Sequence, residues 1–203
     1  MKKNRKMIIF DLDGTISDSF PVTLRAIEKV TGIKPNPKII REKGIIGSFK
    51  KYRLPLFKIP SYVFKIRREI YKNIEEIGLF PGMGEFIRDL KDKGYILGII
   101  TKNQRKTATE FLNKKDIELF DFIWVNFFYF EKTRKIKKAL RKNKVSPENT
   151  FYIGDQVDDI TSSKEANIKS IAVDWGFGDK SSLKEANPHL LASSIEEIDN
   201  FLN

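Results

Sequence analysis

Four short hydrophobic runs recur along the chain after residue 90, and none of them alternates with polar residues. Runs of this length that are rich in Ile, Val, Phe, Tyr and Trp are typical of strands buried on both faces of a sheet. They are YILGIIT (95–101), DFIWVN (121–126), TFYIG (150–154) and SIAVD (170–174), and MIIFDL near the start of the chain is a fifth. The pattern predicts five buried strands that share one sheet.

Helical segments lie between these runs and connect them. They cover residues 82–94, 104–116, 133–144 and 159–167, and the first ends at Gly94, a residue type that often terminates helices. Strands that alternate with helices in this way favour a parallel sheet with helices on both faces. We therefore expect an α/β fold with a doubly wound, Rossmann-like parallel sheet.

Residues 16–80 interrupt this alternation. The segments FPVTLRAIEKVTG (20–32) and VFKIRREIYKNIEEIG (63–78) have helical character, prolines punctuate the region, and no run there is a convincing buried strand. We predict a small helical cap inserted after the first strand at residues 16–79. The sheet domain would then consist of residues 1–15 and 80–203.

The composition narrows the class of protein. The chain has 203 residues, of which 40% are hydrophobic and 32% charged, as in a soluble globular protein of one domain with a modest insertion. It has no cysteine, which excludes disulfides, thiolate metal sites and a thiol nucleophile. The basic start is followed by only four apolar residues, too few for a signal peptide or a membrane span. We expect a cytoplasmic protein with no membrane partner.

The formal net charge is +11, and most of the excess lies in one segment. Residues 16–80 contain 14 Lys and Arg against 6 Asp and Glu, whereas the rest of the chain contains 24 against 21. An electropositive surface there would attract an anionic substrate or nucleic acid. A solvated helical face explains the same excess equally well, since charge alone is a weak guide.

Carboxylates and one hydroxyl follow three of the predicted strands. They are Asp11 and Asp13 after the first strand, Thr101 at the end of 95–101, and Asp155, Asp158 and Asp159 after 150–154. Ligands of an open parallel sheet bind beyond the carboxyl ends of its strands, so these side chains would converge on one rim. Carboxylates without a counterion would repel one another and take up protons. A divalent cation would remove the repulsion, and an all-oxygen set with few protein ligands favours Mg²⁺.

Such a rim suits phosphoryl transfer. A metal neutralises phosphate oxygens, an ionised carboxylate attacks phosphorus, and a second carboxyl gives a proton to the departing alkoxide. Asp11 and Asp13 would divide these two roles. Two simpler explanations are weaker. An EF-hand loop places its glycine sixth and follows a helix, and a turn at Asp13-Gly14 leaves Thr101 and Asp155 unexplained.

Four motifs resemble, in order, those of the haloacid dehalogenase-like hydrolase superfamily in its phosphatase branch. DLDGTISDS resembles the first motif, D-x-D-G-T followed by D-S, and Thr101 in IITKN resembles the Ser/Thr of the second. Lys132 resembles the lysine of the third, and GDQVDD resembles the fourth, G-D-x-x-x-D. The likeness covers the whole sheet domain, and the insertion falls where this family places its cap. The tail, with W-G-F after the strand at 170–174, is similar to phosphoglycolate phosphatase-like members.

The resemblance implies catalytic roles for particular residues. Asp11 is the expected nucleophile, and Asp13 is the expected general acid and later the base that activates water. Thr101 and the backbone N–H of Lys102 are expected to bind the transferring phosphoryl group. Lys132 is expected to balance charge on that group and on Asp11.

The resemblance also implies a magnesium site and a further substrate contact. Asp11, the backbone carbonyl of Asp13 and Asp155 are expected to hold Mg²⁺. Asp159 is expected to orient Lys132 or to bind the metal through water. Asn103 stands where many relatives contact the phosphate, so the expected substrate-binding residues are Thr101, Lys102, Asn103 and Lys132.

Asp13 helps to separate the branches of the family. The dehalogenases displace halide, which leaves without a proton, and they lack this second Asp, so Asp13 favours hydrolysis of phosphate esters. The phosphonate-cleaving branch uses a cap lysine, and the many lysines of the insertion leave that branch open. Some mutases use a cap histidine, whereas His189 lies outside the insertion and is expected to be a structural or surface residue.

Several matches leave a choice between residues or roles. Lys132 stands in FEKTRK rather than the frequent K-P-x-P, and it has three nearby competitors, Lys135, Lys137 and Lys138. Trp175 and Phe177 would line the substrate entrance or pack in the interior, and packing is slightly favoured. The basic stretch EKGIIGSFKKYR (42–53), with Lys50 and Arg53, is expected to meet a remote anionic group of the substrate or to form a solvated helix face.

The sequence as a whole predicts a phosphoric monoester hydrolase. It would act with Mg²⁺ on a small phosphorylated metabolite, similar to phosphoglycolate or a sugar phosphate, through an aspartyl-phosphate on Asp11. The alternatives are a phosphatase for a nucleotide or a nucleic-acid terminal phosphate, and a non-catalytic binding or regulatory member of the fold. Nucleic acid is disfavoured because the chain has no recognised nucleic-acid-binding module. The oligomeric state is not fixed by the sequence.

Overall fold

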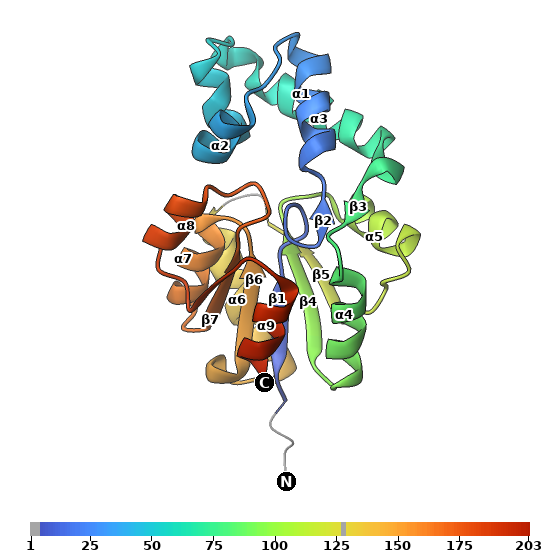
Figure 1. Cartoon of the computed structure of the whole chain (residues 1–203), viewed down its shortest axis with the longest axis vertical. Coiled ribbons are helices and arrows are strands. Elements are labelled where there is room, and N and C mark those ends of the chain that lie inside the picture. Colours follow the sequence, from blue (N-terminus) through green and yellow to red (C-terminus); the bar gives the residue numbers. More distant parts are fainter. Residues whose placement is uncertain (1–4, 127–128) are drawn as a thin grey trace.

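The computed structural model describes residues 5–126 and 129–203 and is built around one parallel sheet (Figure 1). Its six strands lie in the order β5-β4-β1-β6-β7-β8. They are β1 (Met7–Phe10), β4 (Ile96–Thr101), β5 (Phe122–Val125), β6 (Thr150–Gly154), β7 (Lys169–Val173) and β8 (Leu190–Ala192). All five strands predicted from the hydrophobic runs are present in this sheet, so the prediction of an α/β, doubly wound fold is confirmed.

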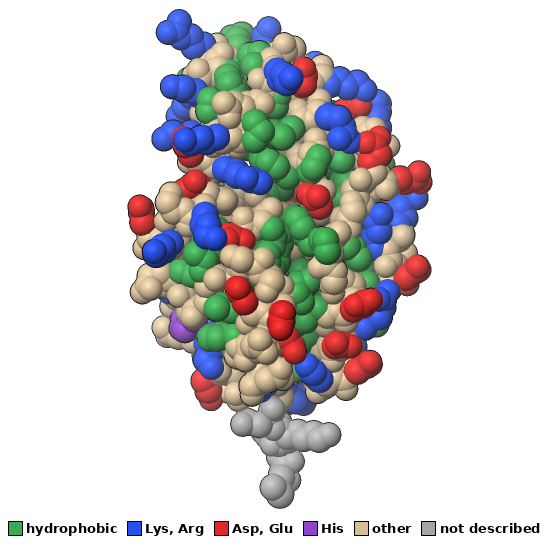
Figure 2. All heavy atoms as spheres, in the orientation of Figure 1, with side chains coloured by type: hydrophobic (Ala, Val, Ile, Leu, Met, Phe, Trp, Pro, Cys, Tyr) green, Lys and Arg blue, Asp and Glu red, His purple; other side chains and the backbone are tan. Residues whose placement is uncertain are grey.

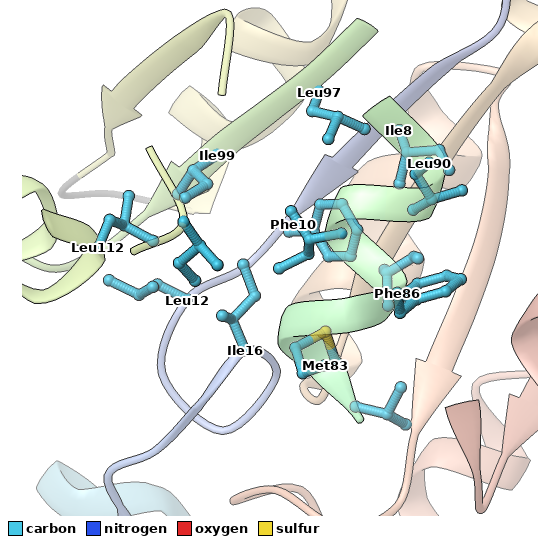
Figure 3. Packing of buried hydrophobic residues seen from close by; sticks show 14 of the residues in the cluster. Ile8, Phe10, Leu12, Ile16, Met83, Phe86, Leu90, Leu97, Ile99 and Leu112 are labelled. Atoms are coloured by element: carbon cyan, nitrogen blue, oxygen red, sulfur yellow. The ribbon is translucent and has the colours of Figure 1, made fainter. Parts of the chain in front are cut away.

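Helices cover both faces of this sheet. They are α4 (Met83–Asp92), α5 (Arg105–Lys114), α6 (Tyr129–Asn143), α7 (Val157–Glu165), α8 (Lys180–Glu185) and α9 (Ile195–Leu202). Successive side chains of a strand point to opposite faces. Ile8 and Phe10 therefore lie in one hydrophobic cluster with residues of α4 and α5 (Figure 3) and of α9, whereas Met7 and Ile9 lie in a second cluster with residues of α6.

The central position of β1 brings three strand ends together. Phe10, the last residue of β1, is paired with Ile99 of β4 on one side and with Ile153 of β6 on the other. All three strands run in the same direction, so the residues that follow them emerge at one edge of the sheet. This edge faces the helices drawn at the top of Figure 1.

Those upper helices form a separate packing unit, here called the helical unit, which spans residues 20–76. It contains α1 (Phe20–Thr31), α2 (Pro37–Lys51), η1 (Leu56–Lys58), α3 (Ile59–Lys72) and η2 (Ile74–Glu76). A hydrophobic cluster of its own, centred on Ile27, Phe49 and Ile66, holds α1, α2 and α3 together. Lys and Arg side chains are prominent over this unit in Figure 2, whereas both charge signs are mixed over the sheet below.

A two-stranded ribbon connects the helical unit to the sheet. The chain leaves the sheet through β2 (Ser17–Asp18) and returns through β3 (Gly78–Leu79), and these two strands are antiparallel neighbours. The ribbon lies close to the boundary expected at residues 16–79. That division into a cap and a sheet domain stays a prediction.

Some helix positions differ from those predicted. The helix α6 begins at Tyr129 rather than 133, so Lys132 lies inside it. The helix α3 begins at Ile59 and ends at Lys72, whereas the predicted helical segment covered 63–78. Its start lies earlier because Pro60 stands in the first turn of the helix, where a proline is tolerated. The helix α2 was not predicted in full, since its two glycines interrupt the pattern and its backbone is non-helical at Gly44. Within the described part of the chain, no helix is both long and apolar enough to cross a membrane.

Candidate active site

Asp11 continues β1 beyond its last residue and stands at the centre of the sheet edge. Its backbone N–H donates a hydrogen bond to the carbonyl oxygen of Ile153 over 2.9 Å, which extends the pairing with β6. Its Oδ1 accepts a hydrogen bond of 2.8 Å from the backbone N–H of Leu12. The side chain is therefore held in one orientation, and Asp11 as a residue is only 8% exposed.

Three buried carboxylates meet at this edge and are here called the carboxylate cluster: Asp11, Asp155 and Asp159. One oxygen from each lies within 4.8 Å of one oxygen from each of the others. Asp155 follows β6 directly, and Asp159 lies in the first turn of α7. The structure thus brings together the three side chains expected at a metal, and the role expected of the backbone carbonyl of Asp13 stays a prediction.

Burial of these carboxylates raises their pKa values. Burial, followed by repulsion from Asp159, raises the pKa of Asp11 well above its usual range, although Lys132 opposes the shift. Burial and Asp159 also raise the pKa of Asp155 to about 7, against the hydrogen bond donated by the backbone N–H of Phe177 over 2.7 Å. A bound cation would reverse this unfavourable arrangement, and oxygen-only ligands suit a hard divalent ion. The residues present therefore fit Mg²⁺.

Lys132 is a buried cation that faces this cluster. Its ammonium group is hydrogen-bonded to Asp159 and lies 3.2 Å from Asp158. Burial lowers the pKa of Lys132, but Asp159, Asp11 and Asp158 together raise it well above the ordinary value. The lysine therefore stays charged and neutralises part of the cluster.

The competing lysines occupy different surroundings on the same helix. Lys137 and Lys138 are exposed, and Lys135 is partly exposed and pairs with Glu131 over 3.2 Å. Lys132 differs from all three because it is fully buried. The geometry thus favours Lys132 as the lysine of the third motif.

Asp13 lies beside the cluster and is held by two side chains. Its Oδ2 accepts a hydrogen bond of 3.0 Å from the amide of Asn103, and its Oδ1 accepts one of 3.4 Å from the hydroxyl of Ser17. Burial raises the pKa of Asp13 above its ordinary value, although the hydrogen bonds from Asn103 and Ser17 oppose the shift. A carboxyl in this position is suited to donate and accept a proton.

The loop after β4 forms the third side of the site. Thr101 is buried, and its hydroxyl accepts a hydrogen bond of 3.0 Å from the backbone N–H of Asn103. The side chain of Lys102 pairs with Asp158 over 2.8 Å. This loop thus lies against both Asp13 and the start of α7.

A cavity of about 420 Å³ opens between this loop and the helical unit. Asp11, Asp13, Thr101, Lys102 and Asn103 line it from the sheet side. The carboxylates and the hydroxyl expected to act on a substrate are therefore accessible from one space, together with the backbone of the loop.

The helical unit contributes residues to this cavity that sequence reasoning missed. Lys43 and Arg67 line it, whereas Lys50 and Arg53 do not. The first half of the stretch 42–53 therefore faces the cavity, and the choice of Lys50 and Arg53 as cavity residues is wrong. Contact of this stretch with a remote anionic group stays a prediction. No local signal marks Arg67, which is one of many cations on α3. Its place at the cavity is evident only from the structure, in which Arg67 donates a hydrogen bond of 3.4 Å to the carbonyl oxygen of Lys102.

Two aromatic residues after β7 have different roles. Trp175 packs against Phe80 with ring centroids 5.9 Å apart, as the packing interpretation favoured. Phe177 also packs, edge-on against Phe20 of α1 with centroids 4.8 Å apart, but it lines the cavity as well. The segment that carries them approaches Gly14 closely, since a Cβ at Gly176 would collide with the carbonyl oxygen of Gly14 and with Asp155.

His189 lies away from this site. The residue is exposed, and its Nδ1 accepts a hydrogen bond of 3.1 Å from the backbone N–H of Ser170. Burial lowers the pKa of His189, with smaller contributions from Lys169 and Lys164. Its surroundings agree with the expected structural or surface role.

Comparison with known proteins identifies the family. A sequence profile described as haloacid dehalogenase-like hydrolase matches residues 8–173. The chain belongs to the haloacid dehalogenase-like hydrolases. The match spans the strands that carry the carboxylate cluster, the loop after β4 and Lys132, so the resemblance inferred from the four motifs is confirmed.

Two curated relatives of this family match nearly the whole chain. A phosphoglycolate phosphatase of Synechococcus elongatus is 25% identical over 200 residues, which cover 94% of each protein. The pyrophosphatase PpaX of Oceanobacillus iheyensis is 25% identical over 207 residues, which cover 95% of this chain and 94% of the relative. These relatives confirm the prediction of a hydrolase of the phosphatase type.

A solved structure supports the fold over the full length. The haloacid dehalogenase-like family hydrolase of Streptococcus pneumoniae is 27% identical, with a TM-score of 0.82. The match covers 98% of this chain and 99% of that one. The likeness thus spans both the helical unit and the sheet of this chain.

Proposed function

We propose that this family member is a Mg²⁺-dependent phosphatase that hydrolyses phosphate monoesters through an aspartyl-phosphate on Asp11. The observation that carries the proposal is the carboxylate cluster, which contacts a buried Lys132 and reaches, through Asp11, a cavity that Asp13 also lines. A binding protein would not require a nucleophile, a second carboxyl and a neutralising cation in one place.

In the first step, an oxygen of Asp11 attacks phosphorus and the bond from phosphorus to the leaving oxygen breaks. Asp13 gives its proton to that oxygen, so the product leaves as a neutral alcohol. In the second step, Asp13 takes a proton from water, the water oxygen attacks phosphorus, and the bond from phosphorus to Asp11 breaks. Inorganic phosphate is released, and both carboxyls return to their initial states.

The remaining residues hold the transferred group and its charge. The hydroxyl of Thr101 and the backbone N–H of Lys102 would donate hydrogen bonds to the phosphoryl oxygens. The ammonium of Lys132 would balance their negative charge, and Asp159 keeps that ammonium in place. Asn103 holds Asp13 in the orientation that proton transfer needs.

Asp11, Asp155 and the carbonyl of Asp13 would hold Mg²⁺, with Asp159 as a ligand through water. The ion would neutralise the phosphate oxygens and the carboxylates around it. The burial and the mutual repulsion of Asp11, Asp155 and Asp159 support this assignment, because a cation would offset both effects, which raise the pKa values of these carboxyls.

The substrate would be a small phosphorylated metabolite that enters between residues 16–79, acting as a cap, and the sheet domain. The name of the Synechococcus relative supports hydrolysis of a phosphate ester, and phosphoglycolate-like and sugar-phosphate-like esters are the polar candidates for the substrate. Cleavage of pyrophosphate, suggested by the name of the Oceanobacillus relative, is the competing reaction. Closure over the cavity would exclude water and strengthen the charge contacts inside it.

A phosphate-release screen over phosphorylated metabolites, nucleotides and pyrophosphate tests this proposal. Release should require Mg²⁺, stop with a chelator, and fall by at least about a thousandfold in Asp11→Asn. The matched control is Asp92→Asn, because Asp92 is an exposed carboxylate at the end of α4. Phosphate release that survives both the chelator and Asp11→Asn would overturn the mechanism, and strong salt dependence on long nucleic acids would favour a nucleic-acid end instead.

A further inference from the structure

The site cavity has two chemically different ends. The sheet supplies its polar end, which consists of Asp11, Asp13 and the loop after β4. The helical unit and one aromatic residue supply an apolar end, whose side chains are Ile40, Ile45, Ile46, Val63, Ile66, Ile70 and Phe177. A phosphoryl group held at the polar end would therefore point its ester substituent toward hydrocarbon.

Part of this apolar end is open to solvent. Ile46 is 54% exposed, and Ile45 and Val63 are only half-buried. A ligand that covers apolar surface removes it from water, which favours binding. Pockets for small molecules are mostly apolar with a few polar groups. An apolar substituent of the substrate would thus cover these side chains and remove them from water.

The backbone of α2 is broken where this surface begins. Gly44 has φ 68° and ψ 171°, a conformation that strains any residue with a side chain. The break interrupts the helix directly before Ile45 and Ile46, both of which line the cavity. A glycine thus stands where the chain changes direction, and the two residues after it, Ile45 and Ile46, line the cavity.

The cations of the lining do not form a second anion site at the apolar end. Arg67 donates to the carbonyl oxygen of Lys102, next to the polar end, and its charge lowers the pKa of Asp13. Lys43 is exposed at the start of the break in α2. Neither cation is buried among the isoleucines, so a short substrate with an anionic group besides its phosphate would leave the apolar end uncovered.

The size of the cavity agrees with a larger substituent. Its volume of about 420 Å³ falls within the usual range for pockets that hold drug-sized molecules. A phosphoryl group esterified to a short hydroxy acid would occupy only a small part of this space.

We propose that the leaving group of the natural phosphate monoester is an apolar alcohol, aliphatic or aromatic, which packs against Ile45, Ile46 and Val63. This inference rests on the proposed function, because it assumes that the polar end binds the phosphoryl group. The specificity-determining contacts then come from α2 and α3, whereas the reacting groups come from the sheet.

A homologous series of n-alkyl phosphates, from ethyl through butyl to hexyl phosphate, tests the inference with Mg²⁺ present. The scissile bond and the acidity of the alcohol are nearly the same along the series, so the contact with the alkyl chain is the main difference. We expect kcat/KM to rise about twofold to fourfold for each added methylene. Hexyl phosphate should also be a better substrate than 2-phosphoglycolate.

Two substitutions connect this rise to the named residues. The double variant Ile46→Ser with Val63→Thr should flatten the series, because each change places a hydroxyl where a methyl group or hydrocarbon chain lines the cavity. Leu56→Ser is the matched control, since Leu56 is 59% exposed and does not line the cavity. It should keep the slope of the wild type, and circular dichroism should show that all three proteins are folded.

The outcomes separate this inference from the proposed function. Hydrolysis of ethyl and hexyl phosphate at equal rates, or a preference for 2-phosphoglycolate, would overturn the inference and leave the phosphatase proposal intact. A slope that persists in the folded double variant would overturn the assignment to Ile46 and Val63. Failure to hydrolyse any ester with Mg²⁺ would overturn both proposals.

Discussion

The side-chain amide of Asn103 donates a hydrogen bond to Oδ2 of Asp13 across 3.0 Å, although 90 positions separate the two residues in the chain. The backbone N–H of Asn103 also donates to the hydroxyl of Thr101. One residue thus connects the proposed acid with the proposed phosphoryl-binding loop. The orientation of Asp13 is therefore fixed in part by a residue from a different strand end.

Asn103→Ala should lower kcat about tenfold to a hundredfold and change KM by less than about threefold, because the proton donor loses its fixed position while the phosphoryl contacts persist. Steady-state kinetics with an aryl phosphate measures both constants. Asn113→Ala, at an exposed position of α5, is the control and should match the wild type. A change confined to KM would show that Asn103 acts on binding instead.

Lys132→Met should lower the free energy of unfolding by about 3–5 kcal/mol, because it leaves the buried carboxylate of Asp159 without its cation. Lys135→Met removes a partly exposed lysine from the next turn of α6 and should cost less than about 1 kcal/mol. Urea unfolding of both variants without Mg²⁺ gives the comparison. Equal losses in the two variants would contradict the role assigned to Lys132.

Magnesium should stabilise the folded protein by binding to the carboxylate cluster. At a concentration about a hundred times Kd, the gain is about 2.7 kcal/mol, which raises Tm by several degrees. Asp155→Asn removes a ligand and should abolish most of this rise. Thermal unfolding with MgCl₂, with NaCl at equal ionic strength, and with a chelator measures it, and an equal rise in the variant would place the ion elsewhere.

Gly176→Ala should weaken Mg²⁺ binding by at least about tenfold and destabilise the fold, because its Cβ would displace Asp155 and the backbone of Gly14. Gly78→Ala is the matched control, since no atom lies within 4 Å of the Cβ position there. Calorimetric titration of both variants with Mg²⁺ measures the affinity. Wild-type affinity in Gly176→Ala would mean that this segment does not shape the metal site.

Asp174 should stabilise the protein at neutral pH through Lys180 and Ser193. Its carboxylate lies 2.6 Å from the Lys180 ammonium and accepts a hydrogen bond of 2.7 Å from the Ser193 hydroxyl. Burial raises the pKa of Asp174, but the two partners lower it by a larger amount. The pKa in the folded protein therefore lies below the ordinary 3.8. The stabilisation is therefore fully present above pH 3.8 and is lost as the pH falls through the folded pKa.

The measurement is the unfolding free energy of the wild type and Asp174→Asn at several pH values. The variant should be less stable by about 1 kcal/mol at pH 7, and the difference should shrink below pH 4. A difference that grows toward acid pH would contradict the assignment.

Much of the sheet was predictable because each buried strand carries its own signal. The run at 150–154 has the same bounds as β6, and the continuous apolar character reflects burial on both faces. Asp11 and Asp155 were placed at one edge by a rule of parallel sheets alone. These predictions needed no knowledge of contacts between distant residues.

The far side of the cavity was not predictable in the same way. The helix α2 has two glycines and a break, so its periodicity is weak, and Lys43 resembles every other surface lysine in the sequence. Arg67 faces the site because of how α3 packs against α1, which no local pattern reports. The choice of Lys50 and Arg53 failed because it relied on charge density rather than on direction.

The ribbon of β2 and β3 has a consequence for engineering and for evolution. The chain passes from the sheet to the helical unit and back through two adjacent antiparallel strands, each only two residues long. Because the two crossings are neighbours, a short turn would join them without moving the sheet. Residues 20–76 are thus attached like an interchangeable module, which could be exchanged between relatives while the carboxylates at the sheet edge stay in register.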